Sequence, residues 1–82
     1  MAKSEHFTSL LNQTTQAEFS RALINEDELN YEVTLNPETG KVTLRMKRNK
    51  NGHWQIEDRT HLPSWVINFE PEFIKAIKKN EV

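Results

Sequence analysis

The sequence predicts an α+β domain in which helices from both ends of the chain cover one face of a three-stranded antiparallel β-meander. Apolar residues recur at helical spacing in residues 5–25 and 71–80, and between these segments they alternate with polar residues. The chain has 82 residues, of which 35% are hydrophobic, and it contains no linker rich in proline, serine or glycine. We therefore expect one small domain over residues 1–82.

Residues 5–25 are predicted to form an N-terminal helix or a helix pair. One broad helical face can hold the apolar residues of this segment, which are Phe7, Leu10, Leu11, Phe19, Ala22 and Leu23. Thr15 and Glu18 have the spacing of a capping box, which favours a helix near residues 5–12 followed by a second near 16–25. One continuous helix is the alternative.

Three strands are predicted at about residues 29–36, 41–49 and 53–60, because apolar and polar residues alternate there with a period of two. The segment 36–40 contains proline and glycine at positions typical of a turn, and Asn49 to Gly52 forms the second turn. Antiparallel neighbours joined by such short turns form a meander.

The register of the two hairpins follows from keeping the apolar side chains on one face. Pairing Leu35 with Val42, and Arg48 with Trp54, achieves this for all three strands. The second pairing requires a type I turn with a bulge at Gly52. The same parity places Asp58 on the core face, so Asp58 is either at a frayed end of the sheet or a functional buried carboxylate.

A C-terminal helix is predicted at about residues 71–80. Pro71 suits the first helical position, and the apolar residues Phe73 and Ile77 can face inward while lysines face outward. The preceding segment, residues 61–70, is compatible with a fourth strand, a helical turn or a loop.

Composition argues against several classes of function. The absence of cysteine excludes disulfides, thiolate nucleophiles and cysteine-based metal sites. His53, Glu57 and His61 extend along a strand too far to converge on one ion, so we expect no metal and no cofactor. No nucleophile elbow or phosphate-binding loop is present, which predicts a protein that is not an enzyme. No apolar run is long enough to span a membrane, and we expect a cytoplasmic protein.

The leading interpretation is therefore a small non-catalytic protein-interaction or homodimerising module, with another protein or a second copy as partner. A three-stranded meander has open edges, and its first strand carries few charges to prevent pairing with another chain. The candidate interaction residues lie on this strand and in the segment before the last helix: Leu29, Tyr31, Val33, Leu35, Trp65, Ile67 and Phe69.

The alternative interpretation is a nucleic-acid-binding accessory protein. The formal net charge is -1, so any attraction to phosphate must be local. The second hairpin provides such a local cluster, and its candidate nucleic-acid contacts are Lys41, Lys47, Arg48 and Lys50.

Overall fold

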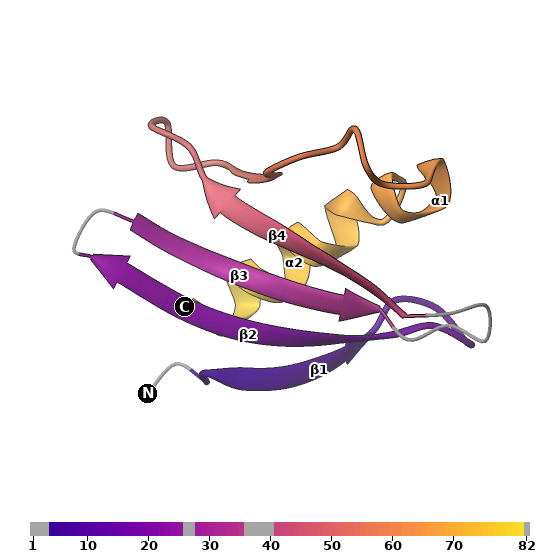
Figure 1. Ribbon diagram of the computed structural model, residues 1–82. Coiled ribbons are helices and arrows are strands. Elements are labelled where there is room, and N and C mark those ends of the chain that lie inside the picture. The colour runs from indigo at the N-terminus through magenta and orange to yellow at the C-terminus, as the bar shows by residue number, and fades with distance from the viewer. Residues whose placement is uncertain (1–3, 26–27, 36–40, 82) are drawn as a thin grey trace.

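A computed structural model describes residues 4–25, 28–35 and 41–81 (Figure 1). Five antiparallel strands form one sheet in the order β1-β2-β3-β4-β5, so each strand pairs with its neighbours in the chain. The strands are β1 (His6–Leu10), β2 (Gln16–Asn25), β3 (Glu28–Leu35), β4 (Val42–Arg48) and β5 (Trp54–Ile56). Two helices follow, α1 (Ser64–Ile67) and α2 (Glu70–Asn80), and α2 lies against one face of the sheet.

The predicted N-terminal helix is wrong, because residues 6–10 and 16–25 are strands. Alternation in β2 turns Ala17 and Phe19 into the core. Leu23, which the helical interpretation placed on the buried apolar face, is 60% exposed. The ring of Phe7 stacks on that of Phe19, with centroids 4.7 Å apart. Pairing with β3 supplies β2 with a hydrogen-bonding partner and a buried face, and this tertiary gain overrides the helical spacing.

The turn between β1 and β2 is fixed by Asn12, where the helical interpretation expected a helix break. The Asn12 side-chain oxygen accepts hydrogen bonds from the backbone N–H groups of Thr14, at 2.8 Å, and Thr15, at 2.7 Å. The Leu11 N–H donates to the Thr15 carbonyl across the turn at 2.9 Å. This asparagine turn directs β2 back along β1.

The predicted three-stranded sheet is also wrong, because its strands are β3, β4 and β5 of a five-stranded sheet. The register predicted within these three strands is confirmed. Leu35 lies opposite Val42, and Arg48 lies opposite Trp54. Gly52 has a φ of 81° in the β4–β5 turn, as the bulged turn requires. The third strand is shorter than predicted and ends at Ile56. Residues 36–40, which hold the predicted first turn, lie outside the described residues.

Asp58 lies in the loop after β5 and is exposed, so it is not a buried carboxylate. Its Oδ1 accepts hydrogen bonds from the hydroxyl group of Thr60, at 2.6 Å, and from the Thr60 backbone N–H, at 3.1 Å. These bonds lower the pKa of Asp58. The carboxylate therefore organises the loop that leads from the sheet to the helices.

Helix α2 occupies the range predicted for the C-terminal helix, and the open question about residues 61–70 is answered by the short helix α1. Phe73 and Ile77 of α2 are buried, and the ring of Phe73 meets Phe19 edge-on at 6.3 Å. The core lies between α2 and the sheet and consists of Ala17, Phe19, Leu29, Tyr31, Val33, Leu35, Leu44, Met46, Trp54, Ile56, Val66, Phe73 and Ile77. Within the described ranges, no helix is long and apolar enough to cross a membrane.

Candidate functional site

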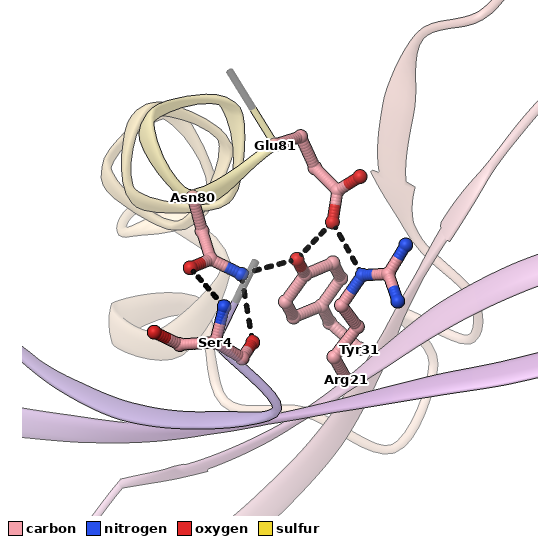
Figure 2. Close-up of polar contacts among 5 residues, drawn as sticks. All are labelled: Ser4, Arg21, Tyr31, Asn80 and Glu81. Carbon is pink, nitrogen blue, oxygen red and sulfur yellow. Dashed lines mark hydrogen bonds and ion pairs between the residues drawn. The ribbon is translucent and has the colours of Figure 1, made fainter. Parts of the chain in front are cut away.

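The most distinctive polar cluster joins the end of α2 to the sheet (Figure 2). The Tyr31 hydroxyl group donates a hydrogen bond to the Glu81 carboxylate and accepts one from the Asn80 side-chain amide at 2.8 Å. Arg21 Nε donates to the same Glu81 oxygen at 2.7 Å. Asn80 also bonds the backbone of Ser4, accepting from its N–H at 3.1 Å and donating to its carbonyl at 2.9 Å.

This cluster changes the acid–base behaviour of its members. Burial raises the pKa of Tyr31 to about 12, and the hydrogen bond to Glu81 acts in the same direction. The contact with Glu81 also raises the pKa of Arg21. The donors and acceptors of this cluster bond one another. We therefore interpret the cluster, which consists of Ser4, Arg21, Tyr31, Asn80 and Glu81, as a clasp that fixes β1 beside α2.

β1 is the edge strand that this clasp holds in place. The Arg21 N–H donates to the Glu5 carbonyl at 2.7 Å, and the Leu11 N–H donates to the Thr15 carbonyl at 2.9 Å. Hydrogen bonds alternate along an antiparallel pair, so the odd-numbered residues of β1 direct their backbone groups toward β2. The N–H and C=O groups of His6, Thr8 and Leu10 therefore point away from the sheet, and the described chain places no strand beyond them.

A groove of about 320 Å³ runs between this edge and α2. Phe7, Thr8 and Ser9 of β1 form one wall, and Ala76, Lys79 and Asn80 of α2 form the other. Side chains of a strand added beside β1 would project alternately into this groove and over the opposite face of the sheet.

The opposite face of the sheet is polar. A depression of about 430 Å³ on this face is lined by His6, Phe7, Thr8, Glu18, Phe19, Ser20, Glu32 and Thr34. His6 Nδ1 lies 2.8 Å from the Ser20 hydroxyl oxygen. In the described part of the chain, no group of three or more histidine and carboxylate side chains is placed to hold a metal ion.

The other edge of the sheet is blocked by a side chain. The carboxylate of Glu70, at the start of α2, accepts a hydrogen bond from the Ile56 backbone N–H of β5 at 2.9 Å. Arg59 donates to both oxygens of the same carboxylate, at 2.5 and 2.7 Å. An incoming strand would have to displace both contacts, so the two edges of the sheet differ in accessibility.

The predicted interaction residues do not form an edge. β3 has β2 on one side and β4 on the other, so the prediction that this strand is an open edge is wrong. Its four candidate residues, Leu29, Tyr31, Val33 and Leu35, are all buried in the core. Trp65 is 37% exposed on α1 and contacts the ring of Phe69, while Ile67 and Phe69 are partly buried.

The candidate nucleic-acid contacts are exposed but divided between two faces. Lys47 lies opposite Gln55 on the polar face, whereas the Arg48 guanidinium lies over the Trp54 ring on the α2 side, 5.8 Å from its centroid. Lys50 is in the β4–β5 turn, and Lys41 precedes β4 at the other end of that strand. The structure therefore does not gather these four cations into one patch.

Sequence reasoning missed the β1 edge because it assigned this segment to a helix. Two signals in the sequence pointed to the strands. Ala17, Phe19 and Arg21 alternate with Glu18 and Ser20, which face the other side of the sheet, and a polar turn begins at Asn12. No family model, curated protein or solved structure matches the chain.

Proposed function

We propose that this chain is a small non-catalytic protein-interaction module that binds an extended segment along the edge of β1. One observation carries the proposal: the outward backbone groups of His6, Thr8 and Leu10 face no other strand of the described chain. Such a row of donors and acceptors is a template for strand addition.

The composition of β1 supports this proposal. Between His6 and Leu10 the strand contains no lysine, arginine, aspartate, glutamate or proline, which are the residues that commonly protect an edge from pairing. By contrast, the Glu70 carboxylate, which is bonded by Arg59, occupies the β5 edge at Ile56. This difference favours one specific contact surface over general edge-to-edge association.

The clasp between α2 and the sheet adds a second argument. Asn80 ties Ser4, just before β1, to α2, and pairing with β2 keeps β1 extended before a partner arrives. A preorganised strand loses less conformational entropy on binding than a free one.

A cytoplasmic location is part of this proposal and is tested by cell fractionation.

A soluble strand peptide tests the proposal, for example acetylated Lys-Thr-Val-Thr-Val-Thr-Lys amide. Titrated into the isotope-labelled protein, it should shift the backbone amide resonances of His6, Thr8 and Leu10. Thr8→Pro removes an outward N–H while leaving the odd-numbered bonds to β2 in place, and it should abolish these shifts. Thr8→Val keeps the N–H and is the matched control.

Two results would contradict this function. The first is that the peptide produces no change at the β1 amides of the folded protein. The second is that Thr8→Pro binds the peptide as well as Thr8→Val does, since the contact would then lie elsewhere.

The charge arrangement gives no comparable support to nucleic-acid binding. Lys47 and Arg48 project to opposite faces, and Arg48 is already engaged with Trp54. A single phosphate backbone would therefore meet only part of the cluster.

A further inference from the structure

The outward groups of β1 are symmetric about Thr8. If a second β1 strand lies antiparallel to the first with Thr8 opposite Thr8, then His6 of each copy lies opposite Leu10 of the other. Each of these three pairs joins two outward-facing residues and therefore supplies two backbone hydrogen bonds. This register leaves none of the outward N–H and C=O groups of β1 unpaired.

The side chains are compatible with this register on both faces of the sheet. On the polar face, threonine meets threonine at the centre, which is a favourable cross-strand pair. Leu10, which is 71% exposed in the single chain, gains the imidazole of His6 from the second copy as a neighbour. On the α2 face, the partly buried ring of Phe7 lies opposite the small Ser9 of the second copy.

The charges within the paired segments do not oppose this pairing. The charged residue nearest to β1 along the sequence is Glu5, and the same register places it opposite Leu11 of the second copy. The two Glu5 side chains therefore lie at opposite ends of the contact, and within the paired segments 5–11 no like charges lie opposite each other.

We infer that the occupant of the β1 edge is a second copy of this chain, paired antiparallel with Thr8 on the two-fold axis. This inference rests on the proposed function and names its partner. The two five-stranded sheets become one continuous sheet, with both α2 helices on the same face and the two grooves meeting at the seam. Because the contact is confined to one short strand, we expect a weak dimer that forms at high micromolar concentration.

Sedimentation equilibrium over a range of protein concentrations tests the inference. The parent protein and Thr8→Val should dimerise with similar dissociation constants. Thr8→Pro should raise the dissociation constant by about tenfold or more, because it removes a donor from each copy at the centre of the seam. Amide resonances of the Thr8→Pro variant confirm that the rest of the sheet is unchanged.

Disulfide trapping tests the register, since the chain contains no cysteine of its own. In the hydrogen-bonded pairs of antiparallel strands the Cα atoms are about 5.5 Å apart, which lies within the range of a disulfide. Thr8→Cys should therefore form a covalent dimer under mild oxidation. Thr43→Cys is the matched control, because Thr43 is exposed on the same face but lies on β4, three strands from the seam.

The outcomes separate this inference from the proposed function. A monomer up to about 1 mM that still binds the strand peptide at β1 overturns the second copy as partner and leaves the interaction module standing. A dimer that tolerates Thr8→Pro, or that is trapped by Thr43→Cys and not by Thr8→Cys, also overturns the inference. A monomer that binds no strand peptide removes both proposals.

Discussion

The hydroxyl group of Tyr31, in the central strand of the sheet, donates a hydrogen bond to the carboxylate of Glu81, 50 residues further along the chain. Glu81 also receives the guanidinium of Arg21 from the neighbouring strand. The tyrosine ring is fully buried while its hydroxyl group reaches the polar contacts at the end of α2. The residue therefore belongs both to the core and to the clasp that holds β1 beside the helix.

Replacing Tyr31 by phenylalanine separates these two roles. Tyr31→Phe keeps the ring in the core but removes the hydrogen bonds to Asn80 and Glu81. We expect the free energy of unfolding to fall by about 1 to 2 kcal/mol. Urea denaturation measures this change, and Thr43→Val on the exposed face of β4 is the control that should have little effect. Equal stability of Tyr31→Phe and the parent would show that the clasp contributes nothing to folding.

The raised pKa of Tyr31 predicts a loss of stability at alkaline pH. The pKa is about 12 in the folded protein, against an ordinary value of 10.0. The folded state therefore holds the phenolic proton more tightly, so this stabilisation is complete below pH 10.0 and is lost as pH rises toward 12. The stability difference between the parent and Tyr31→Phe should shrink over this interval.

Absorbance gives a direct reading of the same group, because the chain has a single tyrosine. The phenolate band of the folded protein should appear near pH 12, and that of the urea-unfolded protein near pH 10.0. Tyr31→Phe provides the baseline. Ionisation of the folded protein at the ordinary tyrosine pKa would contradict the buried, hydrogen-bonded environment.

Asn12 should be the residue most important for the β1–β2 turn. Asn12→Ala removes the oxygen that accepts from the N–H groups of Thr14 and Thr15, and it should lower the free energy of unfolding by about 1 kcal/mol. Asn12→Asp keeps an acceptor and should retain most of that stability. Hydrogen exchange along β1 should accelerate in the alanine variant alone. Unchanged exchange would mean that strand pairing, not the asparagine, sets the turn.

Removing Glu70 should expose the second edge of the sheet. Glu70→Ala leaves the Ile56 N–H and the Arg59 guanidinium without their shared acceptor. We expect a loss of about 1 to 3 kcal/mol in stability, together with species larger than a dimer in light scattering. Glu70→Gln retains an acceptor for the Ile56 N–H and should stay closer to the parent. A parental size distribution for Glu70→Ala would show that the β5 edge needs no protection.

Replacing Trp54 is expected to lower the free energy of unfolding more than replacing Trp65. Trp54 is 7% exposed and meets the ring of Tyr31 edge-on at 5.4 Å, whereas Trp65 is 37% exposed. Trp54→Ala should cost about 3 to 5 kcal/mol, a large share of the stability of a small domain. Trp65→Ala is the matched comparison and should cost less, as thermal unfolding of the two variants would report. Equal losses would contradict the difference in burial.

The second half of the fold was predictable from the sequence because its signals agree. In the β3–β4 and β4–β5 pairs, alternation requires Val33 opposite Leu44 and Met46 opposite Ile56, and the turn residues allow that register. Pro71 and the spacing of Phe73 and Ile77 likewise identify α2. Local pattern and tertiary packing reinforce each other in these elements.

The first half was not predictable in the same way, because residues 16–25 satisfy two patterns at once. Phe19, Ala22 and Leu23 share a helical face, while Ala17, Phe19 and Arg21 alternate as in a strand. The choice depends on whether β3 offers a free edge for pairing, which is long-range information that a local window does not contain. The error in the strand count also placed the open edge at β3, when it lies at β1.

The two hydrogen bonds between Ser4 and Asn80 join residues that are 76 positions apart in the chain. Neighbouring strands can zip together one hairpin at a time, because each contact in that sequence closes a short loop. The Ser4–Asn80 contact closes a longer loop than these hairpins and needs both the sheet and α2 in place, so we expect it to form last. The start of β1 is therefore held beside α2 only in the fully folded molecule. A chain that has not yet formed α2 would not present the β1 edge to a partner in this form.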